Sequence, residues 1–395
     1  MTSVRVLFST TAGAGHFGPM IPVVHACQAA GHPVAVAAPA SFASHVERAG
    51  LPHLPFPDVP TGQMAAVFGR LPSLPREEAN RLVMTEIFGR LDAQAALPTL
   101  LEIIRDWRPD VVVRDPAELG ALVAAVRSDL PQVQVAIDMG GFIAAAADWL
   151  DQPIRELEQL AGIGESCGSQ RILATPTFTA VPAALDHPSL RGSEPGPGRG
   201  RVWRYRLDTT VSGPSLPTEW GDPGAPLVYV SFGSVAGAMS HFTALYPAIL
   251  ETLAELRVRV LLTTGQGFDL ARLGTIPANA WAVSWWPQAA AMRESALVVG
   301  HGGFGTTMTA LAAGVPQLVL PLFSADQFLN AERVEEVGVG TRLLGGLDAL
   351  PEVPRVVPEL LDQAHYAAAA RDVAAEMAAM PDVTTTVAVL EELAS

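Results

Sequence analysis

Short apolar segments alternate with longer segments of helical pattern, and this alternation limits the fold more than any other feature of the chain. In the first half, the segments VRVLFS, PVAVAAP, DVVVRD and VQVAID are rich in apolar and β-branched residues and are bounded by turn residues, as is typical of buried parallel strands. Helical patterns, such as those over 22–30 and 97–107, lie between them. This β-α-β order predicts a parallel sheet with helices on both faces.

The same alternation begins again after a proline- and glycine-rich stretch at 209–226, which is typical of an interdomain linker. We therefore predict an α/β fold with two facing, Rossmann-like, doubly wound domains. Open sheets of this kind bind ligands beyond the carboxyl ends of their strands, so the active site is expected in the interdomain cleft. The predicted boundaries are 1–212 for the first domain, 213–375 for the second and 376–395 for a C-terminal helix that packs back on the first domain.

Composition excludes several classes of function. The net charge of −15 and the pI near 5.0 argue against nucleic acid and anionic membranes as partners. Cys27 and Cys167 lie far apart and outside any Cys/His cluster, so neither a disulfide framework nor a zinc site is indicated. No apolar stretch reaches the ~18 residues that span a bilayer, and no signal peptide is evident. We expect a cytoplasmic protein without a metal or cofactor; the sequence leaves open whether it forms a homodimer.

A glycine-rich turn follows the first predicted strand. Gly13, Gly15 and Gly18 have the G-x-G-x-x-G spacing of a dinucleotide-binding turn. That site also needs an acidic residue at the end of the second strand, and 32–45 contains neither Asp nor Glu. An NAD-dependent dehydrogenase is therefore disfavoured. His16 remains at the tip of this loop, where an imidazole with a pKa near neutrality is suited to acid–base chemistry.

A second glycine-rich turn, in VVGHGGFGTT, joins a predicted strand to a predicted helix. Gly303 and Gly305 allow close approach to a ligand, and Thr306 stands at the start of the helix, where backbone N–H groups favour an anion. His301 adds a hydrogen-bond donor at the same edge. An ordinary capped turn would explain each residue singly, but not the histidine together with the glycines. We predict a diphosphate site.

Three weaker signals lie on neighbouring segments of the second half. Gly233 and Ser234 offer a second loop on the phosphate side, although this pair is also common in turns. Trp285 could stack on a nucleotide base, although tryptophan is more often a core residue. Asp326 and Gln327 could hold sugar hydroxyls, although such residues also begin helices.

Together, the segments GHFGPMIPV, WWPQ, HGGFGTT, GVPQLVLP and DQFLNAERV resemble the UDP-glycosyltransferase superfamily, and more narrowly its bacterial antibiotic and natural-product glycosyltransferases of GT-B fold. The resemblance covers the whole chain. It implies an inverting, metal-independent hexosyltransferase. Its domain at 1–212 would be the acceptor-binding domain, for a hydrophobic small molecule, and its domain at 213–375 the donor-binding domain, for a nucleotide-sugar. Segments 58–91 and 138–154 lie where the family places its acceptor loops.

The resemblance also implies roles for individual residues. His16 would be the general base that deprotonates the acceptor hydroxyl, and Asp115 would orient it. Asp115 could also cap the following helix, with Pro116 at the first helical position. The donor-binding residues implied by the family are Trp285 and Gln288 for the base and ribose, His301 and Thr306 for the diphosphate with Ser234 nearby, and Asp326 and Gln327 for the sugar.

One position departs from the family pattern. UDP-using relatives commonly carry Glu, which grips both ribose hydroxyls, where this chain has Thr309. A deoxyribose lacks the second hydroxyl, so we expect a dTDP-sugar donor, with a deoxysugar favoured. A UDP-sugar donor, a sugar-nucleotide epimerase and a non-catalytic helper of the same fold are the alternatives.

Overall fold

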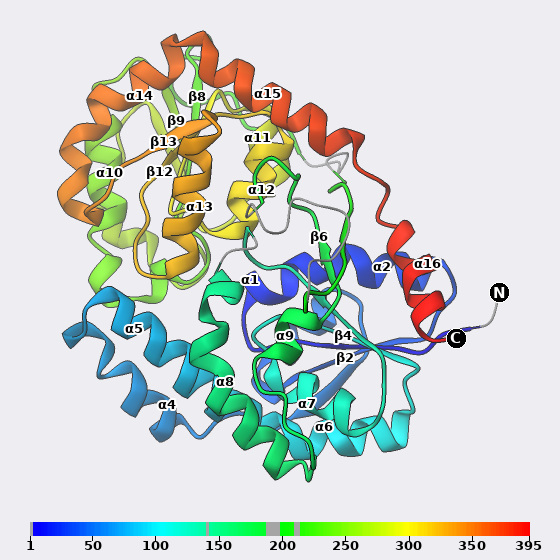
Figure 1. The fold of residues 1–395 in the computed structure, drawn as a ribbon. Coiled ribbons are helices and arrows are strands. Elements are labelled where there is room, and N and C mark those ends of the chain that lie inside the picture. Colours follow the sequence, from blue (N-terminus) through cyan, green and yellow to red (C-terminus); the bar gives the residue numbers. More distant parts are fainter. Residues whose placement is uncertain (1–2, 140–141, 187–197, 209–213) are drawn as a thin grey trace. The chain divides into compact units, whose positions relative to one another are not determined.

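The computed structural model describes residues 3–139, 142–186, 198–208 and 214–395. The chain divides into two compact units, coloured by sequence in Figure 1. The first unit comprises Met1–Arg206 and Met380–Ser395, and the second comprises Leu207–Ala379. The boundary predicted between 212 and 213 lies outside the described residues, as do 140–141 of the predicted acceptor segment 138–154.

Each unit is built on one parallel sheet, so the predicted doubly wound α/β fold is confirmed. The strand order is β3-β2-β1-β4-β5-β6-β7 in the first unit and β10-β9-β8-β11-β12-β13 in the second. In each sheet the order reverses beside the first strand, between β1 and β4 and between β8 and β11. Ligands bind at such switch points in open α/β sheets. The four strands are followed by His16, Asp115, Gly233 with Ser234, and His301, whereas the other candidate residues follow β10 and β12 or lie on α12.

The strands are short and mostly buried. Those of the first sheet are β1 (Val6–Ser9), β2 (Val34–Pro39), β3 (His53–Phe56), β4 (Val111–Arg114), β5 (Gln132–Val135), β6 (Thr177–Thr179) and β7 (Val202–Arg204). Those of the second are β8 (Leu227–Ser231), β9 (Arg259–Thr263), β10 (Ala280–Val283), β11 (Leu297–Gly300), β12 (Gln317–Val319) and β13 (Gly340–Arg342).

Helices connect successive strands. In the first unit they are α1 (Ala14–Phe17), α2 (Ile21–Ala29), α3 (Ala43–Arg48), α4 (Thr61–Phe68), α5 (Arg76–Leu82), the π-helix η4 (Val83–Asp92), α6 (Ala93–Trp107), α7 (Leu119–Arg127), α8 (Phe142–Leu160), α9 (Gln170–Ala174) and α16 (Thr385–Leu393). In the second unit they are α10 (Leu245–Leu253), α11 (Gln288–Glu294), α12 (Phe304–Ala312), α13 (Ala325–Glu336), α14 (Val353–Asp362) and α15 (Ala364–Ala379).

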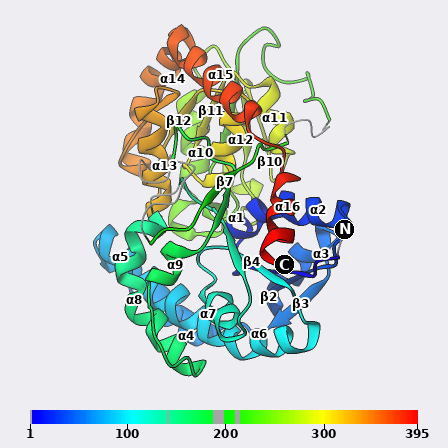
Figure 2. The same ribbon diagram turned by 45° about the vertical axis from the view of Figure 1, so that its right-hand side comes forward.

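The last part of the chain returns to the first unit. After α15 ends at Ala379, the chain passes Pro381, and α16 then packs against α2, as Figure 2 also shows. Two polar contacts attach this segment: the backbone N–H of Arg206 donates to the carbonyl of Pro381, and the Arg206 guanidinium lies 2.7 Å from Asp382.

The core of each unit follows the two-residue period of its strands. In the first sheet, Leu7 and Val112 pack with residues of α6, α7 and α8 on one face, while α2 lies on the other (Figure 1). In β8, Val228 and Val230 join the core beneath α10 and α14, whereas Tyr229 joins the cluster with α11 and α12. Helices on both faces leave the carboxyl edge of each sheet as the place for a site.

Candidate functional site

His16 lies at the carboxyl edge of the first sheet, in the short helix α1 that follows β1. Its side chain is 23% exposed, and its Nδ1 is 3.2 Å from Oδ1 of Asp115. Asp115 follows β4, which pairs with β1 so that Ser9 lies opposite Arg114. The two residues are 99 positions apart in the sequence, and adjacent parallel strands bring them together.

A dense set of donors holds the Asp115 carboxylate, which is fully buried. Oδ2 accepts hydrogen bonds from the backbone N–H of Thr11 at 2.9 Å and from the Thr10 hydroxyl at 3.0 Å. Oδ1 accepts from the backbone N–H groups of Ala117 at 2.7 Å and Glu118 at 3.1 Å. The carboxylate is therefore fixed from both sides while Oδ1 faces the imidazole.

These contacts determine the ionisation of Asp115. Burial alone would raise its pKa. The charge and hydrogen bond of His16, together with the backbone N–H groups of Thr11 and Ala117, hold the pKa below its ordinary value instead. Asp115 is thus an anion at neutral pH and accepts the Nδ1 proton of His16.

The alternative prediction, that Asp115 caps the next helix with Pro116 at the first helical position, is wrong. Helix α7 begins at Leu119, and its N-cap is Glu118, whose carboxylate accepts from the N–H groups of Gly120 and Ala121. Asp115 instead closes the preceding turn by accepting from Ala117 and Glu118. The helix therefore has its own cap, and Asp115 is not needed for that purpose.

An aromatic ring also contacts His16. Phe88, in the π-helix η4, has its ring centroid 5.4 Å from that of the imidazole. Thr10, Thr11, Glu118 and Phe88 were not singled out from the sequence. Only Glu118 had a usable signal, because acidic residues are enriched where helices begin and Glu118 directly precedes the apolar run LGALVAAV.

In the second unit, the His301 imidazole lies between two glycines at the end of β11. A Cβ at Gly233 would come within 2.8 Å of Nε2 of His301, and a Cβ at Gly303 would overlap the same atom. Both positions therefore need glycine for the ring to fit. Gly233 lies just after the neighbouring strand β8, which pairs with β11. The structure therefore brings these predicted residues together, with Ser234 exposed beside them.

His301 is uncharged at neutral pH. Burial lowers its pKa to about 4, and a hydrogen bond with the backbone of Ser231 opposes this only partly. Its Nδ1 is enclosed and has no partner with good hydrogen-bond geometry in the described part of the chain. A neutral imidazole acts on an anion as a hydrogen-bond donor rather than as a counter-charge.

Helix α12 begins beside His301 without a side-chain cap. Its N-cap is Gly303, which has extended backbone and no capping side chain, so the first N–H groups of the helix are available to an anion. Thr306 lies in the first turn and is 8% exposed. Its hydroxyl accepts a hydrogen bond from Nε2 of Gln288 at 2.9 Å, which joins two predicted donor residues from α11 and α12.

The two tryptophans before α11 have opposite environments. Trp285 is 64% exposed, whereas Trp286 packs edge-to-face on Trp281 with ring centroids 5.1 Å apart. Trp285 is therefore not a core residue, and its ring is available for stacking on a flat ligand.

The start of α13 lies against the glycine turn. A Cβ at Gly302 would come within 2.7 Å of the carbonyl oxygen of Gln327. The Gln327 side chain is only 2% exposed, and its Oε1 accepts from the N–H groups of Leu322 and Phe323 at 2.9 and 3.2 Å. Gln327 thus shapes the loop after β12, whereas Asp326 in the same turn is half-buried.

Asn330 was not predicted as a site residue. Its side chain is fully buried, and its Nδ2 donates to the carbonyl of Gly302 at 2.7 Å. This bond fixes the turn that carries His301. On α12, the family's glutamate position is occupied by Thr309. Its hydroxyl donates to the carbonyl of Gly305 at 2.7 Å and so bonds within its own helix.

No helix among the described residues is both long and apolar enough to cross a membrane. Over the same ranges, no group of three or more His, Cys, Asp or Glu side chains is placed to hold a metal ion.

Two family models match the chain. Residues 25–162 match the N-terminal domain of the erythromycin biosynthesis protein CIII-like family, and residues 247–393 match its C-terminal domain. An L-demethylnoviosyl transferase of Streptomyces niveus is 32% identical over 96% of this chain and 95% of its own.

Solved structures of glycosyltransferases are similar to this chain over its whole length. The glycosyltransferase SnogD of Streptomyces nogalater superposes with a TM-score of 0.75 at 29% identity, over 100% of both chains. The spinosyn rhamnosyltransferase SpnG, solved with thymidine diphosphate, superposes with a TM-score of 0.79 at 25% identity, over 98% of this chain and 100% of that one.

Proposed function

We propose that this chain, which belongs to the erythromycin biosynthesis protein CIII-like family of bacterial natural-product glycosyltransferases, transfers a sugar from a dTDP-linked donor to a hydroxyl of a hydrophobic aglycone, with inversion at the anomeric carbon. The observation that carries the mechanism is the buried, ionised Asp115 carboxylate, 3.2 Å from Nδ1 of His16. A buried carboxylate held on an imidazole at the ligand-binding edge of a sheet is suited to general-base chemistry.

His16 acts as the base. Because Asp115 is an acceptor, it selects the tautomer with the proton on Nδ1, which puts the basic lone pair on Nε2. Nε2 takes the proton of the acceptor hydroxyl as its oxygen attacks the anomeric carbon. The imidazolium that forms is stabilised by the Asp115 charge, as in other carboxylate–histidine pairs.

The second unit stabilises the leaving group. As the new carbon–oxygen bond forms, the bond from the anomeric carbon to the diphosphate breaks, and dTDP leaves with additional negative charge. The N-terminus of α12 and the neutral His301 donor face this charge. A single displacement from the opposite side inverts the anomeric centre. The step requires the acceptor at His16 and the donor at α12 to meet in one complex.

The preference for dTDP rests on Thr309. Its hydroxyl bonds to the backbone of its own helix and presents no charge to a ribose 2′-hydroxyl. Compared with a glutamate at this position, threonine costs a deoxyribose nothing, whereas it costs a ribose the charge-assisted hydrogen bond of its 2′-hydroxyl. The binding of thymidine diphosphate by SpnG supports the same choice.

The three alternative functions predict different reaction products or donor preferences. A UDP-sugar transferase would differ only in donor preference. An epimerase would release free sugar nucleotide products without an acceptor, and a non-catalytic helper would show no turnover.

The test uses the purified full chain with matched dTDP- and UDP-sugars and an aromatic polyketide aglycone. We expect transfer from dTDP-sugars, release of dTDP, and the opposite anomer in the product by NMR. EDTA is expected to leave the rate unchanged. Thr309→Glu should raise the kcat/KM for UDP-sugars relative to dTDP-sugars. Preference for UDP-sugars in the unaltered protein, or retention of the anomeric configuration, contradicts the proposal.

A further inference from the structure

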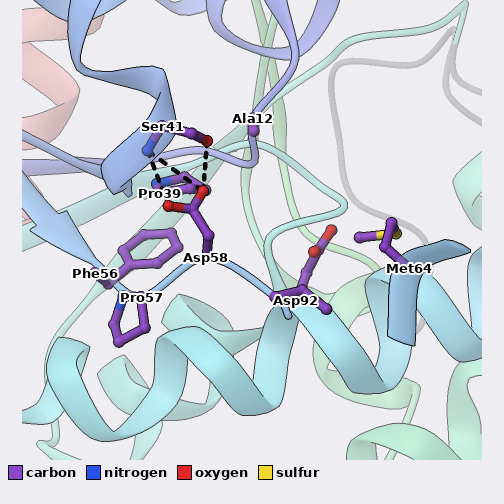
Figure 3. A pocket seen from close by; sticks show the side chains of 9 residues that line it. Ala12, Pro39, Ser41, Phe56, Pro57, Asp58, Met64 and Asp92 are labelled. Carbon is purple, nitrogen blue, oxygen red and sulfur yellow. Dashed lines mark hydrogen bonds between the residues drawn. The ribbon is translucent and has the colours of Figure 1, made fainter. Parts of the chain in front are cut away.

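A cavity of about 180 Å³ opens at the carboxyl edge of the first sheet, beside Ala12 in the loop between β1 and α1 (Figure 3). It is lined by the ends of β2 and β3 and by residues of α4 and η4. Most of the wall is apolar, including Pro39, Phe56 and Met64. Such a wall suits the flat rings of an aromatic ligand.

The two carboxylates in this wall have different surroundings. Asp58 accepts hydrogen bonds from the backbone N–H of Ser41 at 3.0 Å and from the Ser41 hydroxyl. Asp92 points into the cavity (Figure 3) and, across the ranges that the structure describes, it makes neither a hydrogen bond nor an ion pair. The Asp92 carboxylate thus receives no hydrogen bond from the described part of the protein and can accept one from a ligand.

Helix capping does not account for Asp92. It directly precedes α6, where an aspartate often caps the first turn. Its backbone is helical, with φ −63° and ψ −49°, and its side chain makes no capping bond. The reason is that η4 runs into α6 without a break, so the N–H groups at this junction already have partners in the preceding turns.

Asp92 lies close enough to the catalytic pair for their charges to interact. Burial and the Asp115 charge raise its pKa from 3.8 to about 6, while His16 acts in the opposite direction. Phe88, four residues earlier on the same π-helix, contacts the His16 ring. Phe88 and Asp92 therefore lie about one helical turn apart, both near the pair His16 and Asp115. π-Helical turns are frequent at functional sites.

We infer that Asp92 determines acceptor specificity: it accepts a hydrogen bond from a second hydroxyl of the aglycone, while the apolar wall holds the ring that bears both hydroxyls and the nucleophilic hydroxyl faces His16. This inference rests on the proposed function. It predicts a polyhydroxylated aromatic acceptor rather than one with a single hydroxyl.

A neutral hydroxyl suits this position better than an ammonium group. His16 becomes positively charged as it takes the acceptor proton, and a cation next to it would oppose that step. A hydroxyl donates to the Asp92 carboxylate without adding charge, and such charge-assisted bonds are stronger than neutral ones.

The test measures binding without the donor, by calorimetry, so it does not depend on turnover. The probes are 2-naphthol and its 2,3- and 2,7-dihydroxy counterparts. We expect at least one diol to bind the unaltered protein about tenfold more tightly than 2-naphthol does. Asp92→Asn should reduce this ratio, and Asp92→Leu should abolish it while 2-naphthol affinity is kept. Glu102→Gln, an exposed carboxylate change on α6, is the matched control.

Thermal stability and sugar transfer, measured on the same variants, distinguish a failure of the Asp92 inference from a failure of the proposed function. Asp92→Leu should raise Tm, because it removes an unsatisfied half-buried carboxylate, and a lower Tm would overturn the claim that Asp92 lacks a partner. Equal affinity for mono- and dihydroxy probes, equal weakening of all probes by both variants, or no binding would each overturn the inference. Discrimination without sugar transfer would instead contradict the proposed function, and transfer without discrimination would leave that function intact.

Discussion

Asp115→Asn is the substitution whose consequences the structure defines most closely. In the proposed mechanism, losing the carboxylate removes the charge that stabilises the His16 imidazolium. A hydrogen bond to a charged group contributes about 1.5–3 kcal/mol, and each ~1.4 kcal/mol is tenfold in rate. We therefore expect kcat to fall by at least about 10- to 150-fold, and further if the new amide selects the wrong imidazole tautomer, an effect of roughly 10⁴-fold in serine proteases.

The same substitution also disturbs the fold. Both Asp115 oxygens accept backbone N–H groups, Oδ2 from Thr11 and Oδ1 from Ala117, so either orientation of an amide turns its NH2 toward a donor. Leaving a buried donor unsatisfied costs about 1–3 kcal/mol. Because the folded-state pKa of Asp115 is lowered, its stabilising contribution is present above the ordinary carboxyl pKa of 3.8 and is lost as the pH falls below it. The difference in stability between the two proteins should therefore shrink in strong acid.

The assay compares initial rates of sugar transfer at saturating dTDP-sugar, at a temperature well below the Tm of the variant. Asp106→Asn, which changes an exposed carboxylate of the same unit, is the control and should retain the full rate. A rate for Asp115→Asn within twofold of the unaltered protein would refute the role given to Asp115.

Three further predictions concern other parts of the molecule. Asn330→Ala should lower stability by about 1–3 kcal/mol and raise the donor KM, because the Gly302 carbonyl loses its buried donor; an unchanged Tm and KM would contradict this. His301 has a folded-state pKa of about 4 against 6.5, so stability should fall as the pH drops from 6.5 toward 4, and His301→Gln should flatten this slope in denaturant titrations. Buried Cys27, whose pKa is raised to about 12, should react with Ellman's reagent only on unfolding, unlike half-buried Cys167; equal reactivity would contradict this.

The sequence predicted the sheets well because buried parallel strands leave a strong signal. Segments such as DVVVRD and PLVYVSFGS form β4 and β8. Four strands were not predicted. β3 contains Pro55, and the three-residue strands β6, β7 and β13 lie outside any long apolar run, whereas the equally short β12 belongs to the apolar segment QLVLPL. Pairing with a neighbouring strand, rather than local sequence, defines them.

The candidate site was predictable where residues follow strands. Asp115 and His16 follow adjacent strands, which long-range pairing places side by side, and His301 follows the strand next to Gly233. Asp92 carried no signal, because it gains its role only from a cavity formed by segments from several parts of the chain.

Helix periodicity could have refined one prediction. On α13, the buried residues Gln327, Asn330, Ala331 and Val334 recur at i, i+3, i+4 and i+7, which is the inward face of a helix. That pattern places Gln327 and Asn330 toward the protein. Their hydrogen bonds show what each supports: Asn330 fixes the glycine turn, and the Gln327 side chain fixes the loop after β12.

In the proposed reaction, an imidazole in one unit and an anion site in the other act in a single transfer step. The most direct measurement pairs the kcat of His16→Ala with its Kd for dTDP, determined by calorimetry. We predict a loss of transfer of two orders of magnitude or more with an unchanged dTDP affinity. Transfer at the rate of the unaltered protein would contradict the role of His16 as the base.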